Sequence, residues 1–277
     1  MKSLSSPLIT GIIADLKKKL GVNLIAIYGI GSCFDDSLPE NFMKNDIDLI
    51  AIVRSTKSLG KFSIKEIGKK HIFIGYNTIE SYNNKKIFDE ISGANYEWSL
   101  ICIKHPENSK LLYGTDIRNQ IPETTNIQFD YDNILIRGFY HLEKSFKNGL
   151  RDIAKLEYSK TLFKFGFYFC VLHDKTFRHV SLTEIRKKLK KLYKSGAIDS
   201  QIFEYFETAF NYRCRGEYDS DFHLLRLKTR YYFISLLSKR KTHRLMDYTE
   251  IKTFFSSYFG GLPILKVFVR NLELKKH

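Results

Sequence analysis

The sequence predicts an α/β (α+β) domain with a small mixed sheet, followed by an all-α helical bundle. Short apolar runs of the kind that form buried strands recur in the N-terminal half, as far as Ile103. From about Asp130 onward, apolar residues instead recur at every third or fourth position, as they do along amphipathic helices. A polar stretch with glycine and proline, residues 111–128, lies between the two patterns and is the predicted crossover.

The predicted elements follow from these patterns in chain order. A helix over Pro7–Leu20 ends at Gly21. Four apolar runs then have the length and composition of strands: Asn23–Gly29, Asp46–Val53, His71–Tyr76 and Tyr96–Ile103. Helical spacing predicts further helices over residues 78–91, 133–146, 158–172, 182–193, 202–210 and 224–237. We therefore predict a catalytic domain over residues 1–125 and a helical, substrate- or partner-binding domain over residues 126–277.

Positive charge is concentrated in the C-terminal half of the chain. Residues 1–125 hold 16 Lys and Arg against 14 Asp and Glu, a net charge of +2. Residues 126–277 hold 29 against 16, a net charge of +13. Such a surface attracts anions, so a negatively charged partner is one interpretation and a solvated lysine-rich surface is the other.

The cysteines indicate the compartment. Cys33, Cys102, Cys170 and Cys214 are far apart and form no C-x-x-C pair, so neither a disulfide framework nor a zinc site is expected. We expect reduced thiols and a cytoplasmic protein. No segment is long and apolar enough for a signal peptide or a membrane span, and no membrane partner is expected.

A glycine-rich turn and a pair of acids carry the predicted chemistry. Gly29 to Ser32 follow the first apolar run, and Asp46 and Asp48 open the next one. Because side chains alternate along a strand, both acids point to one face and Ile47 points to the other. Two carboxylates beside a buried strand are unfavourable unless compensated, and magnesium ions, which prefer oxygen ligands and bridge to phosphate, would compensate them. Since glycines let backbone N–H groups approach phosphate closely, the turn predicts a phosphate site facing a metal site.

This pattern resembles that of the DNA polymerase beta superfamily of nucleotidyltransferases, including its kanamycin-type and minimal branches. The resemblance is carried by an apolar strand, Gly31-Ser32, a spacer and then Asp46-Ile47-Asp48, all in the N-terminal half. It implies transfer of a nucleoside monophosphate from a nucleoside triphosphate, ATP in the first instance, to a hydroxyl acceptor by a two-metal mechanism. Gly31 and Ser32 would hold the triphosphate, and Asp46 and Asp48 would hold two Mg²⁺ ions, or Mn²⁺ in their place.

The same resemblance implies two further site residues. In the family a third acid on a later strand completes the metal site, and Glu97 in the run YEWSLICI matches it best. Glu97 would also serve as general base, while Glu80, Asp89 and Glu90 compete for the position. The segment LLYGTDIR resembles a Tyr-Gly segment of the family, which makes Arg118 a candidate phosphate contact. The other interpretation of Arg118 is a surface charge beside a turn.

The chain also departs from the family pattern directly after Gly31-Ser32. Cys33, Phe34, Asp35 and Asp36 stand where a small or basic residue and another glycine are usual. The two extra acids favour an alternative in which a decayed core serves as a non-catalytic antitoxin-like or RNA-binding module.

The acceptor is left open between two classes. Aminoglycoside-type adenylyltransferases share the two-domain plan, but their polycationic substrates would be repelled by a strongly basic half, whereas RNA or tRNA suits the charge better. Six basic residues on one predicted helix are candidate contacts to an RNA backbone: Arg186, Lys187, Lys188, Lys190, Lys191 and Lys194. A solvated helix face is the other interpretation.

Overall fold

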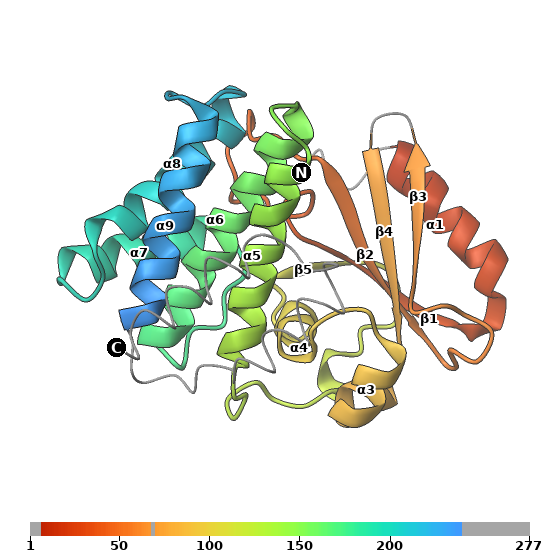
Figure 1. Ribbon diagram of the computed structural model, residues 1–277. Helices are drawn as coiled ribbons and strands as arrows, with labels where there is room; N and C mark the ends of the chain where they lie inside the picture. Colours follow the sequence, from red (N-terminus) through yellow and green to blue (C-terminus); the bar gives the residue numbers. More distant parts are fainter. Residues whose placement is uncertain (1–6, 68–69, 240–277) are drawn as a thin grey trace. The chain divides into compact units, whose positions relative to one another are not determined.

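The computed structural model describes residues 7–67 and 70–239 (Figure 1). These residues belong to two compact units. Of the described residues, the first unit contains those up to Asp130 together with Gly166–Phe203 and Arg213–Gly216. The second contains Tyr131–Phe165, Glu204–Tyr212 and residues 217–239. The predicted division into functional domains at residue 125 stays a prediction.

The first unit is built on a five-stranded mixed sheet with the order β3-β4-β2-β1-β5. Its strands are β1 (Leu24–Ile30), β2 (Asp46–Val53), β3 (Phe62–Ile67), β4 (Lys70–Asn77) and β5 (Ser109–Gly114). β2 and β4 run parallel, and the other neighbouring pairs are antiparallel. The predicted mixed sheet and the predicted strands β1, β2 and β4 are therefore confirmed.

Alternation along β2 divides the core of this unit into two layers. Ile47 and Leu49 lie in one buried cluster with Ile12 and Leu16 of helix α1 (Pro7–Leu20). The intervening positions, beginning with Ile50, lie in a second cluster, to which helices α2 (Ile79–Asn83), α3 (Lys85–Ile91) and α4 (Tyr96–Lys104) contribute. Because Asp46 and Asp48 keep step with Ile50, they lie on the face of the second cluster.

The expectation of a strand over Tyr96–Ile103 is wrong, because this segment is helix α4. The side chain of Asn95 accepts a hydrogen bond from Trp98 N and so caps the helix at its start. Four consecutive residues of the helix are apolar and buried: Leu100, Ile101, Cys102 and Ile103. Consecutive residues point to different sides of a helix, so α4 is buried on several sides. A short apolar run of this kind does not distinguish a buried helix from a buried strand.

The structure differs in detail from two other predictions. The predicted helix over residues 78–91 is confirmed as two short helices, α2 and α3, which meet at Asn84. The predicted crossover over residues 111–128 begins inside strand β5. Gly114 ends that strand with φ of +84°, and a Cβ at this position would lie 2.0 Å from the carbonyl oxygen of Ile25. Glycine is therefore required where β5 turns away from β1.

The remaining predicted helices are confirmed. They are α5 (Tyr131–Lys147), α6 (Asp152–His173), α7 (Leu182–Lys194), α8 (Ser200–Arg215) and α9 (Phe222–Lys239). Two short 3₁₀ helices, η1 (Gly21–Asn23) and η2 (Arg118–Gln120), connect elements of the first unit. Within residues 7–67 and 70–239, no helix combines the length and hydropathy that a membrane crossing requires.

Aromatic packing and a buried hydroxyl pair hold the second unit together. The rings of Phe165 and Phe233 lie 4.1 Å apart between centroids. The hydroxyl groups of Tyr158 and Thr229, both buried, are 2.6 Å apart. Burial of the aromatic rings supplies most of the stabilisation of such a bundle, and the hydroxyl pair satisfies polar groups that would otherwise destabilise it.

Candidate active site

Asp46 and Asp48 open β2, and the carboxylate of Asp48 lies beside the glycine-rich turn. Both acids are partly exposed, whereas Ile47 between them is buried against the α1 side. In the antiparallel pair, Asp48 lies opposite Ile30, the last residue of β1. Gly31 follows directly, with φ of +74°, and a Cβ built on it would lie 3.2 Å from Asp48 Oδ2. The predicted juxtaposition of the acid pair with the turn is thus present at Asp48.

The turn itself is shaped by Phe34. A Cβ on Gly29 would lie 2.6 Å from the Phe34 ring, so only glycine lets the ring cover the end of β1. Phe34 N donates a hydrogen bond of 3.0 Å to Gly31 O, which closes a turn that contains Ser32. Phe34 and Cys33 are buried in the cluster on the α1 side. These two departures from the family pattern are therefore core residues that hold the turn in place.

The two extra acids after the turn are already engaged. Asp36 forms an ion pair with Lys110 of β5, and the hydrogen bond from Lys110 lowers the pKa of the Asp36 carboxyl. Asp35 accepts hydrogen bonds from the backbone N–H of Ser37, at 2.9 Å, and from the Ser37 hydroxyl, at 2.5 Å. Lys110 pairs with Gly29, whereas Asp48 pairs with the next residue, Ile30. Because side chains alternate along a strand, Lys110 and Asp48 lie on opposite faces of the sheet. The charge of Lys110 is therefore balanced by Asp36 on the face away from Asp48.

The loop from the turn to Asp46 is anchored by the C-terminal end of α8. Arg213 Nε and Nη2 both donate to Met43 O, at 2.9 and 2.5 Å, and Met43 N donates to Arg213 O at 2.6 Å. The guanidinium group also lies over the Phe42 ring, 5.1 Å from its centroid. Cys33 Sγ donates to Asp46 O at 3.0 Å. The backbone that leads into the acid pair is therefore held from two directions.

Across the parallel pair, the neighbours of Asp46 and Asp48 are His71 and Phe73 of β4. Residues paired across neighbouring strands share a face, so His71 and Phe73 lie on the face of the acids. His71 Nδ1 lies 3.2 Å from Glu66 Oε1 of β3. The adjacent strand therefore presents an imidazole and a phenyl ring at the positions beside the pair. The sequence gives no local signal of this, because strand pairing is non-local.

Glu97 lies in the first turn of α4 and not on a strand. Its side chain is 8% exposed, with Oε1 3.3 Å from Lys85 Nζ and Oε2 accepting a 2.9 Å hydrogen bond from Asn95. The ammonium group of Lys85 also contacts Asp89. The role of Glu97 as third acid stays a prediction, and its carboxylate is engaged by an ion pair and a hydrogen bond.

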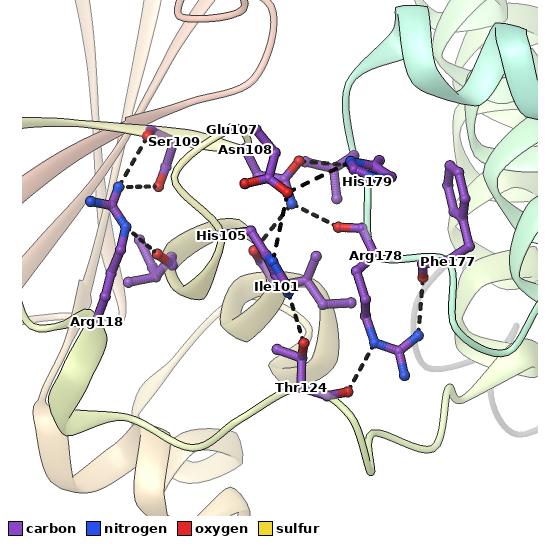
Figure 2. Close-up of polar contacts among 12 residues, drawn as sticks. Ile101, His105, Glu107, Asn108, Ser109, Arg118, Thr124, Phe177, Arg178 and His179 are labelled. Carbon is purple, nitrogen blue, oxygen red and sulfur yellow. Dashed lines mark hydrogen bonds and ion pairs between the residues drawn. The ribbon is translucent and has the colours of Figure 1, made fainter.

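Arg118 joins helix α4 to the start of β5, the edge strand of the sheet (Figure 2). Its Nε donates to Ile103 O at 2.9 Å, and its Nη2 donates to the carbonyl and hydroxyl oxygens of Ser109, both at 3.1 Å. Ser109 pairs with Ile30, which pairs in turn with Asp48, so Arg118 is bonded to the row that carries the acid. Its role as a phosphate contact stays a prediction.

A tyrosine buried in the sheet completes this arrangement. Tyr28 donates its hydroxyl proton to Asp116 at 2.9 Å and accepts from Ile117 N at 2.8 Å. Burial raises the pKa of Tyr28 to about 12, so its hydroxyl stays protonated and remains a donor. Arg118 Nη1 pairs with the same Asp116 carboxylate at 2.7 Å.

A second polar network joins the end of α4 to the segment before α7 (Figure 2). Asn108 Nδ2 donates to Ile101 O and Arg178 O, at 3.3 and 2.8 Å, and its Oδ1 accepts from Val180 N at 3.1 Å. Arg178 Nε donates to Thr124 O at 2.9 Å. One buried amide thus joins α4 to the approach to α7 within the first unit.

The N-terminus of α7 continues this contact to the loop after the turn. The hydroxyl of its N-cap, Ser181, lies 3.0 Å from the Ser37 hydroxyl. Thr183 Oγ1 donates to Ser37 O at 3.2 Å. The loop that carries Ser32 at its start is therefore held by α7 as well as by Arg213.

The donor set of Asp46 and Asp48 fits a Mg²⁺ ion that arrives with a triphosphate. Both carboxylates are partly exposed, and Mg²⁺ is commonly bound by one or two carboxylates with phosphate oxygens and waters as further ligands. Among the described residues, no group of three or more His, Cys, Asp or Glu side chains is placed to hold an ion.

Two solved structures are similar to the chain at low sequence identity. One is a spectinomycin adenyltransferase from Enterococcus faecialis, solved with ATP and spectinomycin, at 12% identity and a TM-score of 0.49, covering 80% of this chain and 95% of that one. The other is a nucleotidyltransferase-like protein from Exiguobacterium sibiricum, at 13% identity and a TM-score of 0.27, covering 98% and 92%. No family model and no curated protein matches the chain. With identities and TM-scores this low, the function has to be argued from the residues of this chain.

Proposed function

We propose that the chain is a nucleotidyltransferase that moves a nucleoside monophosphate from a triphosphate, ATP in the first instance, to a hydroxyl acceptor. The observation that carries the proposal is the closeness of Gly31 to the Asp48 carboxylate, with Asp46 on the same face of β2. A glycine turn next to paired acids is an arrangement that suits a metal-bound triphosphate.

Each residue of the site has a distinct role in this proposal. Gly31 and Ser32 bind phosphate oxygens through backbone N–H groups and the serine hydroxyl. Asp46 and Asp48 would hold Mg²⁺ beside the triphosphate. When bound, the metal neutralises phosphate charge and lowers the pKa of the acceptor hydroxyl.

The transfer is a nucleophilic displacement at the α-phosphorus. The acceptor oxygen forms a bond to the α-phosphorus while the bond from that phosphorus to the bridging oxygen breaks. Pyrophosphate leaves with the electron pair, and the hydroxyl proton passes to solvent. What the chain supplies is position and electrostatic stabilisation, which account for most of the rate enhancement in phosphoryl-group transfer.

RNA is the acceptor class that the charge distribution favours. The net charge of +13 on residues 126–277 attracts a polyanion and repels a polycation such as an aminoglycoside. The alternative of a non-catalytic module rested on Asp35 and Asp36. Its basis is weaker because Asp36 pairs with Lys110 and Asp35 accepts from Ser37.

The proposal is tested by triphosphate binding and by transfer. Isothermal titration with each nucleoside triphosphate, with and without Mg²⁺, is expected to give binding that needs the metal. The double variant Asp46→Ala/Asp48→Ala is expected to lower that affinity at least about 100-fold. Labelled ATP, CTP, GTP and UTP incubated with total RNA and small-molecule pools then report donor and acceptor.

A matched control separates the acid pair from loss of charge in general. Asp15 and Glu90 are exposed acids of the same unit, and the double variant Asp15→Ala/Glu90→Ala changes the net charge equally. It is expected to bind triphosphate as the unmodified protein does. Absence of metal-dependent binding in the unmodified protein, or equal loss in both double variants, would overturn the enzymatic assignment.

A further inference from the structure

Helix α7 has one apolar side and one strongly basic side. Ile185, Leu189 and Leu192 are buried, at 1%, 0% and 8% exposure. Four exposed lysines follow helical spacing on the other side: Lys187, Lys190, Lys191 and Lys194. Residues three and four apart are neighbours on a helix surface, so these lysines form a continuous stripe.

Ion pairs divide the lysines of α7 into two groups. Lys187 Nζ lies 2.6 Å from Glu184 Oε1, and Lys188 Nζ lies 2.6 Å from Asp174 Oδ2. The side chain of Lys188 is 24% exposed, so it serves to hold α7 to the end of α6. Among the residues that the structure describes, no ion pair involves the C-terminal lysines of α7, which are Lys190, Lys191 and Lys194. These three are therefore the charges that remain available to a partner.

An exposed aromatic platform stands beside these lysines. Tyr193 is 43% exposed, and its ring is stacked on Phe203, with centroids 5.9 Å apart and an interplanar angle of 9°. Tyr193 follows Lys190 by three positions, so the ring and that charge are neighbours on the helix surface, and Lys194 adjoins Tyr193 in the chain. Phe203 fixes the plane of the tyrosine ring while leaving much of it open.

We propose that this surface, defined by Lys190, Lys191, Lys194 and Tyr193, binds single-stranded RNA. Lysines neutralise backbone phosphates, and an exposed ring stacks on an unpaired base; together they are the two features of single-strand binding sites. A membrane-surface helix would instead expose a row of large apolar side chains. On α7 the aliphatic residues Ile185, Leu189 and Leu192 are in the core. The inference concerns binding alone, so it can fail without the transfer reaction failing.

The test measures RNA binding to the full-length protein in the absence of nucleoside triphosphate. Fluorescence anisotropy with a labelled single-stranded RNA oligonucleotide, repeated between 50 and 200 mM salt, is expected to show affinity that falls steeply with salt. The variant Lys190→Glu/Lys194→Glu is expected to bind roughly 10-fold or more weakly and to show a smaller salt slope. Tyr193→Ala is expected to lose about 5- to 150-fold, and Tyr193→Phe less than about 2-fold.

Three controls test whether a loss of RNA affinity is specific to this surface. The variant Lys18→Glu/Lys19→Glu changes two exposed lysines of α1 and gives the same change of net charge. It is expected to bind RNA within about 2-fold of the unmodified protein. Asp46→Ala/Asp48→Ala is expected to keep RNA binding, which separates this proposal from catalysis. Thermal unfolding of every variant, with Lys190→Gln/Lys194→Gln as a milder pair, checks that α7 remains folded.

Several outcomes would overturn the inference. Equal loss of affinity in the α1 and α7 variants would show a general charge effect. Unchanged affinity in Tyr193→Ala would remove the stacking site. Binding to vesicles of anionic lipid, with no binding to the oligonucleotide, would assign the surface to a membrane instead.

Discussion

Gly31 lies so close to Asp48 that a side chain at position 31 would crowd the Asp48 carboxylate. A Cβ on Gly31 would lie 3.2 Å from Asp48 Oδ2. The backbone at Gly31 has φ of +74°, in the left-handed region that other residues occupy only with strain. Both constraints favour glycine at this position. The backbone conformation of the turn is thus matched to the close approach of the Asp48 carboxylate.

Substitution of Gly31 by alanine is expected to reduce both stability and triphosphate binding. A left-handed alanine costs about 1–2 kcal/mol of unfolding free energy. The added methyl group also displaces the Asp48 carboxylate or the turn, so metal-dependent triphosphate affinity is expected to fall roughly 10-fold or more. Urea unfolding and isothermal titration measure the two effects.

Gly196 supplies the matched control, because its φ of +71° is almost the same and its Cβ would meet no atom within 4 Å. Gly196→Ala is expected to lose comparable stability and to bind triphosphate normally. If both variants lose affinity alike, or if Gly31→Ala binds like the unmodified protein, Gly31 is not part of the phosphate site.

The acid-bearing strand could be predicted from sequence because its information is local. Asp46-Ile47-Asp48 alternates, and alternation assigns each side chain to a face without knowledge of the rest of the fold. His71 could not be placed beside Asp46 in this way, because their neighbourhood depends on the parallel pairing of β2 with β4. No residue of either strand specifies that pairing by itself.

Two other segments could not be assigned correctly from the periodicity of apolar residues. The segment from Tyr96 to Ile103 is apolar enough to match a strand, and only the capping side chain of Asn95 marks it as a helix. Strand β3 is an edge strand whose residues are mostly exposed, so it lacks the apolar run that identified the central strands. An exposed edge strand and a fully buried helix both lack the regular change between apolar and polar residues on which such predictions depend.

Glu97→Gln separates a structural role of this side chain from a metal-binding role. Glu97 is buried against Lys85 and Asn95, so removal of its charge is expected to lower the unfolding free energy by about 1–3 kcal/mol. Metal-dependent triphosphate affinity is expected to change less than about 3-fold, because Asp46 and Asp48 remain. Denaturant unfolding and titration with Mg²⁺ and ATP give the two numbers. A large loss of affinity with unchanged stability would restore Glu97 as third ligand.

Arg213→Lys is expected to loosen the loop that leads to Asp46. Lysine keeps the charge but loses the fork that donates twice to Met43 O, so unfolding free energy is expected to fall by about 1–3 kcal/mol. Triphosphate affinity is expected to fall as well, because Asp46 lies three residues after Met43. Arg215→Lys, at an exposed position two residues further on, is the control and should change neither quantity. Equal behaviour of the two variants would show that Arg213 does not position the loop.

The pair formed by His141 and the buried Glu157 predicts that the protein loses stability in mild acid. His141 Nδ1 lies 2.6 Å from Glu157 Oε2. Burial lowers the pKa of His141 below 6.5, although the hydrogen bond and charge of Glu157 oppose this. Burial alone would raise the pKa of Glu157. The hydrogen bond from His141 and the charge of Lys160 outweigh that effect and lower the pKa to about 2. The folded pair is thus a neutral imidazole that donates to a carboxylate.

The sign of the pH effect follows from which state binds the proton first. As pH falls through about 6.5, His141 takes up a proton in the unfolded chain before it does so in the folded one, so unfolding becomes more favourable. The slope contributed by His141 is at most about 1.4 kcal/mol per pH unit. Glu157 contributes its loss only below about pH 4.5, so it does not interfere between pH 7.5 and 5. His141→Gln, which can still donate to Glu157 but does not titrate, is expected to show a smaller loss over this range in urea unfolding. Equal slopes in the two proteins, or a gain of stability for the unmodified protein in acid, would mean that His141 is charged in the folded state.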